Sequence, residues 1–251
     1  MRRVRHAPLG RCLYCLAGAV PLTEEHLIPR ALGGRLTLRD AVCEPCRRIT
    51  GRLEQATLAR EFAVPRTLLA LKRRRARGNG PNRLPPVVLA GGGAEPVALA
   101  ADMFPRGFSL PAFQPAGLSA GAAGADTSPR IDFVACRLDL GTPTRHSAAA
   151  AVPLADPYAY ACSIAKWAYT LAVAERGLAC CDTQAMRDLL LGRRNDVFAF
   201  VGSLPAHAPA AREWLHEASV HENGPWLTVR LALFASAGMT PYEVVIGRCE
   251  T

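Results

Sequence analysis

Two Cys-x-x-Cys pairs constrain this chain more than any other feature of its sequence. Cys12 and Cys15 form the first pair, and Cys43 and Cys46 form the second. One such pair alone is as typical of a redox site as of a metal site, but two pairs complete the tetrahedral sulfur shell that Zn²⁺ prefers. Four protein ligands leave no position open for a substrate. We therefore expect a structural zinc that joins two segments separated by 27 residues.

The five remaining cysteines are expected to have a different role. The total of nine is odd, and the basic start of the sequence is not followed by the apolar segment of a secretory signal, so a disulfide framework is not expected. Cys162 lies among apolar residues and is expected to be buried like a small hydrophobic side chain. Cys180 and Cys181 are adjacent, and a redox role for this pair is the alternative.

Positive charge is concentrated in the first third of the chain. Residues 1–83 hold 18 Lys and Arg against 6 Asp and Glu, whereas residues 84–251 hold 12 against 15. A strongly basic segment attracts polyanions, of which nucleic acid is the commonest. All but two of the basic residues are arginines, and the planar guanidinium binds phosphate through two parallel hydrogen bonds. The distribution predicts a nucleic-acid-binding surface in the first third.

Composition excludes several classes of protein. A hydrophobic content of 50% excludes a wholly disordered chain. No apolar run approaches the length of about 18 residues that a membrane-spanning helix needs, so we expect no membrane partner and a cytoplasmic location. A length of 251 residues fits one large domain or two small ones.

The segment between the two cysteine pairs carries the most specific pattern. It contains Glu25-His26-Leu27-Ile28-Pro29 and then Gly33-Gly34. In this order and spacing, the chain from about residue 12 to 60 resembles the HNH endonucleases of the ββα-metal superfamily, in the branch with zinc knuckles. The resemblance implies a hairpin with Glu-His at the end of its first strand. Gly33-Gly34 would form the turn, the second strand would lead into Cys43, and a helix would follow from about Arg47.

The resemblance also implies a chemistry for these residues. His26 would act as the general base that activates a water molecule for attack on a phosphodiester. Glu25 matches the acidic position that the family uses to bind a divalent ion, Mg²⁺ or Mn²⁺. Asp40 stands where the family commonly has an asparagine that orients the histidine, and its carboxylate can accept the same hydrogen bond.

Arg47 departs from the family pattern. The residue after the last cysteine is usually Asn or His and often a metal ligand, whereas a guanidinium repels a cation. Three alternatives follow. The site uses fewer protein ligands, it recruits a ligand from elsewhere in the chain, or the protein binds DNA without cutting it.

Several basic side chains are candidates for contact with the nucleic-acid backbone. Little aromatic sequence is interleaved with them, which favours double-stranded DNA over a single strand, and RNA stays an alternative. The candidates are Arg30, Arg35, Arg47, Arg48, Arg52, Lys72, Arg73, Arg74 and Arg75.

Three segments follow one another along the chain, and the expected fold class is α+β. Residues 1–77 would form the HNH-like zinc and nuclease domain with a basic helical extension. Residues 78–130 are rich in Gly, Pro and Ala and are expected to be a linker and irregular segment, with short strands at 86–90 and 96–101 and a loop across 105–129. Residues 131–251 would form a C-terminal α+β domain that selects the target, regulates the nuclease or mediates assembly.

The C-terminal segment has clear helix and strand signals. Asp156-Pro157 predicts the start of a long apolar helix that ends near Arg176, and a second helix is expected to end at Leu191. Strands are expected at 131–140, 197–201, 218–220, 226–234 and 242–246. Lys166 lies within the apolar helix, and its ammonium is expected to reach solvent. His216 is expected beside a solvent-facing strand.

Overall fold

The computed structural model describes residues 4–69, 71, 88–89, 107–121, 131–137, 150–151, 156–205 and 214–249. The basic tract from Lys72 to Arg75 and the strand expected at 96–101 lie outside the described residues.

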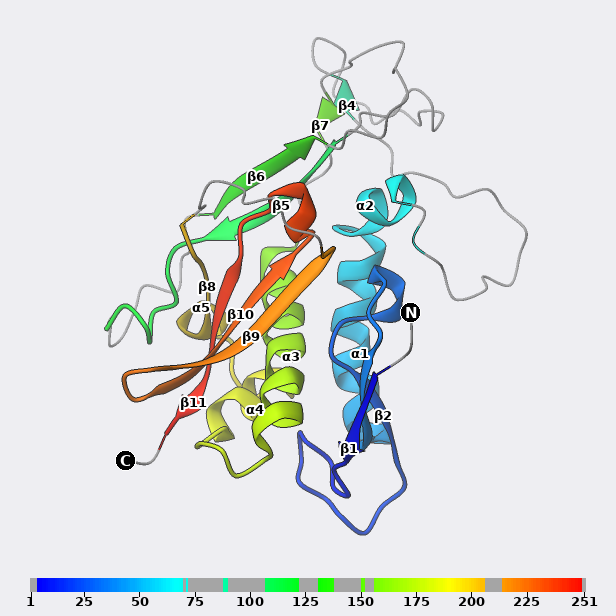
Figure 1. The fold of residues 1–251 in the computed structure, drawn as a ribbon, viewed down its shortest axis with the longest axis vertical. Helices are drawn as coiled ribbons and strands as arrows, with labels where there is room; N and C mark the ends of the chain where they lie inside the picture. The colour runs from blue at the N-terminus through cyan, green and yellow to red at the C-terminus, as the bar shows by residue number, and fades with distance from the viewer. Residues whose placement is uncertain are drawn as a thin grey trace, which may run out of the picture.

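The N-terminal unit is a three-stranded sheet with one long helix (Figure 1). Its strand order is β1 (Val4–Pro8), β3 (Leu36–Cys43), β2 (Leu22–His26), with β1 parallel and β2 antiparallel to β3. The hairpin of β2 and β3 confirms the predicted ββα arrangement, because His26 ends the first strand and Cys43 ends the second.

The turn of this hairpin depends on its two glycines. After the short 3-10 helix η1 (Arg30–Leu32), Gly33 has φ +88°, a left-handed conformation that favours glycine. A Cβ atom on Gly34 would lie 1.9 Å from the carbonyl oxygen of Ile28. Neither position accepts a side chain without movement of the backbone, so the chain can return to β3 only with glycine here.

Helix α1 (Glu44–Ala59) follows β3 without a loop. It begins three residues earlier than the expected Arg47, because Cys43 takes the N-cap position and Pro45 fits in the first turn, where a backbone N–H is not needed. The short helix α2 (Ala63–Leu68) comes next along the chain.

The C-terminal region is built on a four-stranded antiparallel sheet (Figure 1). Its strand order is β8 (Val201–Ser203), β11 (Tyr242–Arg248), β10 (Trp226–Leu233), β9 (His216–Asn223). The strand expected at 197–201 is wrong, because residues Val197–Phe200 form helix α5 and only then does β8 begin. A short apolar run has no period long enough to separate a helix from a strand.

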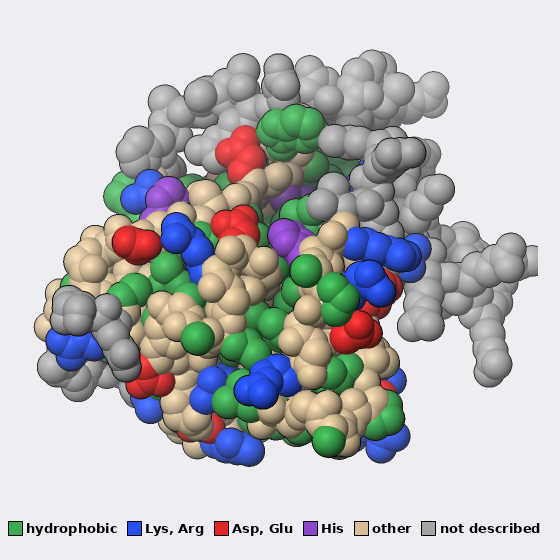
Figure 2. All heavy atoms as spheres, turned by 60° about the horizontal axis from the view of Figure 1, so that its bottom comes forward, with side chains coloured by type: hydrophobic (Ala, Val, Ile, Leu, Met, Phe, Trp, Pro, Cys, Tyr) green, Lys and Arg blue, Asp and Glu red, His purple; other side chains and the backbone are tan. Residues whose placement is uncertain are grey.

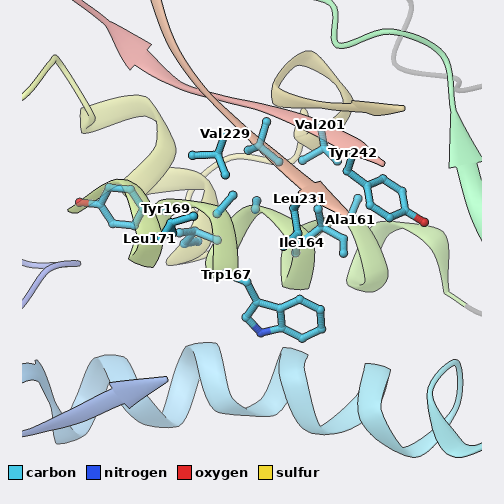
Figure 3. Packing of buried hydrophobic residues seen from close by; sticks show 14 of the residues in the cluster. Ala161, Ile164, Trp167, Tyr169, Leu171, Val201, Val229, Leu231 and Tyr242 are labelled. Carbon is cyan, nitrogen blue, oxygen red and sulfur yellow. The ribbon is translucent and has the colours of Figure 1, made fainter. Parts of the chain in front are cut away.

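Helix α3 (Pro157–Arg176) is the centre of the molecule. Asp156 accepts hydrogen bonds from the N–H groups of Tyr158 and Ala159, and Gly177 ends the helix, as predicted. The 15 residues from Ala159 to Val173 are all buried. The reason is that α3 lies between the sheet and α1, so that Trp167 points toward α1 while Val229 lies on the opposite side (Figure 3). In the described part of the chain, no helix is long and apolar enough to cross a membrane.

Part of the predicted linker belongs to the core. The expectation of a loop across 105–129 is wrong for β5 (Gly107–Phe113), which pairs with β6 (Ile131–Arg137). Phe108 and Leu110 are buried on either side of exposed Ser109, an alternation typical of a half-buried strand. The remaining described elements are strands β4 (Val88–Leu89) and β7 (Ala150–Ala151), helix α4 (Gln184–Leu190) and the 3-10 helix η2 (Ala235–Ala237).

The buried hydrophobic residues of both regions form one cluster. Phe62, between α1 and α2, contacts the rings of Tyr160, Trp167 and Phe234 with centroid distances of 5.5, 5.7 and 6.0 Å. The division of the chain at residues 77 and 130 stays a prediction, but the N-terminal unit does not have a core of its own.

Replacement of Phe62 tests this shared core. Phe62 is fully buried, so Phe62→Ala removes the ring from three aromatic contacts and leaves a cavity that should cost about 3–5 kcal/mol in the free energy of unfolding. Ile49→Ala on α1 is the matched control, because Ile49 is 41% exposed and its truncation should cost less than about 1 kcal/mol. Urea unfolding followed by circular dichroism measures both. Equal losses in the two variants would contradict a shared core at Phe62.

Candidate functional site

The four paired cysteines meet in one cluster. Their Sγ atoms all lie within 4.8 Å of one another, and Cys15 Sγ is 3.6 Å from Cys43 Sγ. A tetrahedral zinc with bonds of about 2.3 Å places its sulfur ligands about 3.8 Å apart. The cluster therefore fits Zn²⁺ in both donor type and spacing, as the sequence predicted.

Local backbone geometry brings the two pairs together. In the first pair, the N–H of Leu16 donates to the carbonyl of Cys12, and Leu16 adopts φ +63°, so the chain reverses between β1 and β2. In the second pair, Cys43 caps α1 and Cys46 lies in its first turn, where the positive end of the helix favours thiolates.

Burial shows why the cluster needs a cation. Cys12, Cys43 and Cys46 are buried and only Cys15 is exposed. Burial raises the pKa of Cys43 and of Cys46, so thiolates at these positions require a positive charge among them. Four cysteine ligands fill the tetrahedral shell of a zinc ion and leave no open coordination position, so the ion would be structural.

Adjacent residues of β2 point to opposite faces of the strand. Glu25 is 6% exposed, whereas His26 is half-buried at the end of the strand. Successive side chains alternate across a strand, so Glu25 points into the core when His26 points toward the outer face. Alternation therefore predicts that the side chains of Glu25 and His26 point to different faces.

Glu25 meets two charged residues inside the protein. Nζ of Lys166 on α3 lies 2.7 Å from a carboxylate oxygen of Glu25, and it also contacts the carboxylate of Glu54 on α1. Trp167 Nε1 donates a second hydrogen bond to Glu54, at 3.2 Å. Burial raises the pKa of Glu25, although the positive charge of Lys166 opposes this shift.

The expectation that Lys166 reaches solvent is wrong. Its side chain is 6% exposed, within the packed length of α3. Burial by itself lowers the pKa of a lysine, but the charges of Glu25 and Glu54 outweigh burial here and raise the pKa of Lys166, so it is an ammonium. Sequence reasoning missed this triad because its members lie on three separate elements.

Asp40 lies further from His26 than the family pattern implies. Thr37 is the residue opposite His26 in the ladder of β2 and β3, and Asp40 is three residues further along β3. That separation is about 10 Å along a strand. Asp40 is exposed and has φ +46°, beside an irregularity of the ladder between Thr23 and Glu25. A hydrogen bond from His26 to Asp40 stays a prediction.

The candidate arginines on the N-terminal unit are exposed. Arg47 and Arg48 both pair with Glu44 in the first turn of α1, at 2.6 and 2.8 Å. On the face shown in Figure 2, Lys and Arg side chains lie in several separate groups with Asp and Glu among them. A nucleic-acid backbone on this face would therefore meet separate basic groups and not one continuous basic patch. The exposed candidates are Arg30, Arg35, Arg47, Arg48 and Arg52.

His216 joins the hairpin turn to the C-terminal sheet, which no sequence pattern indicated. It is half-buried rather than solvent-facing, and its Nε2 lies 2.7 Å from the carbonyl oxygen of Leu32. Its Nδ1 accepts a hydrogen bond from the N–H of Phe234. These two bonds require the neutral ring with its proton on Nε2, and burial lowers the pKa of His216.

Comparison with protein families gives a match to this unit. Residues 12–63 match the family described as HNH endonuclease. The comparisons with curated proteins and with solved structures gave no match. The matched segment contains the four cysteines, β2, β3 and α1, and it ends at Ala63, the first residue of α2.

The zinc assignment predicts one ion per chain. Cys46→Ser removes a buried ligand, so zinc content measured by mass spectrometry should fall from about one ion per chain to nearly none, and the N-terminal unit should lose its helix content. Cys249→Ser is the control, because Cys249 is a free cysteine outside the cluster and its loss should leave the zinc in place. Retention of zinc by the Cys46 variant would refute the assignment.

His216 predicts a pH dependence of stability. Because the folded protein holds the ring neutral, the unfolded chain binds a proton more readily below the ordinary histidine pKa of about 6.5. Stability from this residue is complete above that pH and is lost as the pH falls, by at most about 1.4 kcal/mol per pH unit. Urea unfolding between pH 5 and 7.5 should show this loss in the wild type and not in His216→Gln. His221→Gln, at a half-buried site on the same strand, should keep the wild-type slope.

Proposed function

We propose that this protein hydrolyses phosphodiester bonds in double-stranded DNA, because residues 12–63 match the HNH endonuclease family. The observation that carries the proposal is the placement of His26. It ends the first strand of a hairpin whose other end, where Leu22 pairs with Cys43, joins the four-cysteine cluster, so a zinc ion would anchor the hairpin that carries the reactive group.

His26 supplies the general base in this proposal. An imidazole accepts a proton near neutral pH, and transfer of a water proton to it generates the nucleophile that attacks phosphorus. His26 is half-buried rather than enclosed in the core, and the proposal requires that a water molecule and a phosphate reach its ring. We assign the orientation of this ring to Asp40, and the support for this assignment is the resemblance to the HNH family.

Exposed arginines supply phosphate binding. Arg47 and Arg48 lie in the first turns of α1, and Arg52 follows one turn later. The charge of a guanidinium is retained at all relevant pH values, and its planar donors match a phosphate. Arg30 and Arg35 lie at either end of the hairpin turn and would contact the backbone on the other side of His26.

A divalent ion, Mg²⁺ or Mn²⁺, is the cofactor that the family implies for this reaction, and it would stabilise charge on the phosphate. The arrangement of Glu25 does not fit that role. Its carboxylate is buried and in contact with an ammonium, and Arg47 stands where the family often has another ligand. The proposed hydrolysis therefore does not use a metal ion bound to Glu25.

A second candidate function is DNA binding without cleavage. The observation that favours it is the same ion pair between Lys166 and Glu25, together with Arg47, because a site with fewer metal ligands loses hydrolysis before it loses affinity for phosphate. The basic residues would then hold DNA while another component acts on it.

Nicking of supercoiled plasmid separates the two functions. Purified protein with one zinc per chain should convert supercoiled DNA to the open circle in Mg²⁺ or Mn²⁺, and His26→Ala should lower the rate at least a hundredfold because the base is lost. EDTA in place of the added ion tests whether a divalent ion takes part. A folded RNA in the same buffer tests the alternative substrate.

The matched control is His221→Ala, at a half-buried histidine on β9 of the C-terminal sheet. It should cleave at the wild-type rate. Binding of a labelled duplex should be equal for the wild type and His26→Ala. Plasmid that stays intact with wild-type protein that binds the duplex would favour the second function over the first.

A further inference from the structure

A buried triad of charges joins the two halves of the molecule. Glu25 comes from β2, Glu54 from α1 and Lys166 from α3, and Glu54 precedes Lys166 by 112 residues. The ammonium lies against both carboxylates, 2.7 Å from that of Glu25. Lys166 and Glu25 are buried and the side chain of Glu54 is 19% exposed, so the pair is removed from water beside a third, partly exposed charge, at the level of α3 where Trp167 turns toward α1 (Figure 3).

In this arrangement the ammonium of Lys166, and not a metal ion, is the cation in contact with the carboxylate of Glu25. A carboxylate oxygen of Glu25 is in direct contact with Nζ of Lys166, whose side chain is 6% exposed and cannot move aside into water without opening the core. A divalent ion bound at this carboxylate would meet the ammonium of Lys166 in a poorly solvated space.

We propose that Lys166 is the resident cation of Glu25, so that Glu25 is not a metal ligand in this protein and instead fixes β2 against α3. The inference rests on the proposed function in one respect, because it makes Lys166 a positioning residue for His26, the neighbour of Glu25 on β2. It also assigns a role to the C-terminal region, which completes the site by supplying Lys166.

Other polar contacts between α3 and the N-terminal unit support this role. Trp167 Nε1 donates to Glu54, which lowers the cost of its burial. The hydroxyls of Thr57 and Ser163 are 2.9 Å apart on the same two helices, and Tyr169 donates to the carbonyl of Leu13 beside the first cysteine pair. Helix α3 thus holds the N-terminal unit through polar contacts at three points along its length.

Mn²⁺ binding to the full-length, zinc-loaded protein tests the proposal. The free ion gives a strong electron paramagnetic resonance signal, and Mn²⁺ does not compete for thiolate ligands. Glu25→Gln keeps the shape of the side chain and leaves Lys166 paired with Glu54. If Lys166 is the resident cation, Glu25→Gln should change the dissociation constant for Mn²⁺ by less than twofold. A loss of tenfold or more would overturn the proposal.

Removal of the ammonium gives the opposite test. Lys166→Met leaves two buried carboxylates without a positive charge, so this variant should bind Mn²⁺ at least tenfold more tightly than the wild type. The double variant with Glu25→Gln should lose that gain. If Lys166→Met is folded and gains no affinity, the proposal fails. If Lys166→Met does not fold, the comparison of the wild type with Glu25→Gln still decides.

Cleavage kinetics test the positioning role. Lys166→Met should lower kcat for plasmid nicking about tenfold or more, while KM changes less than threefold because the exposed arginines are intact. Lys166→Arg keeps a positive charge and should recover part of kcat. A rise in KM with unchanged kcat would contradict positioning of His26. The Mn²⁺ measurements do not depend on cleavage, so an inactive wild type with the expected Mn²⁺ affinities would refute the proposed function and leave the assignment of Lys166 standing.

Discussion

The packing of α3 against α1 is the interaction on which the other parts of this protein depend. One side of α3 covers the antiparallel sheet, and the other receives α1 through Trp167, the Thr57–Ser163 hydrogen bond and the ion pairs of Lys166 (Figure 3). A helix buried on all sides has no solvent-facing stripe where a charge can be placed cheaply. The charged residue within it is therefore matched by two carboxylates, and both come from the N-terminal unit.

Two adjacent residues of β2, Glu25 and His26, have different environments and different proposed roles. Glu25 is buried and takes part in the ion pair that holds the strand, whereas His26 is half-buried at the end of the same strand. A zinc ion in the four-cysteine cluster would hold one end of the hairpin, and Lys166 contacts Glu25 near the other end. Such a restraint gives an imidazole a fixed position with respect to a bound phosphate.

Sequence reasoning worked where the deciding contacts are short in sequence. The helix from Asp156 to Gly177, the hairpin with Gly33 and Gly34, and the cysteine cluster all follow from caps, turns and ligand spacing. It failed at β5, where a Gly, Pro and Ala-rich composition concealed a strand, and at α5, where a short apolar run was ambiguous. The partner strand β6 pairs with β5 along its length, and α5 packs against α3, so local propensity is a weak guide in both places.

The sequence by itself determined the zinc shell, the order of strand, turn, strand and helix, and the residues that resemble a nuclease, because each depends on residue types at fixed short spacings. Only the tertiary structure decided that Lys166 is buried, that it pairs with Glu25 and Glu54, and that His216 reaches Leu32. The physical reason is that the cost of burying a charge depends on its partner. Those partners lie more than a hundred residues away along the chain and become neighbours only when α1 and α3 pack together.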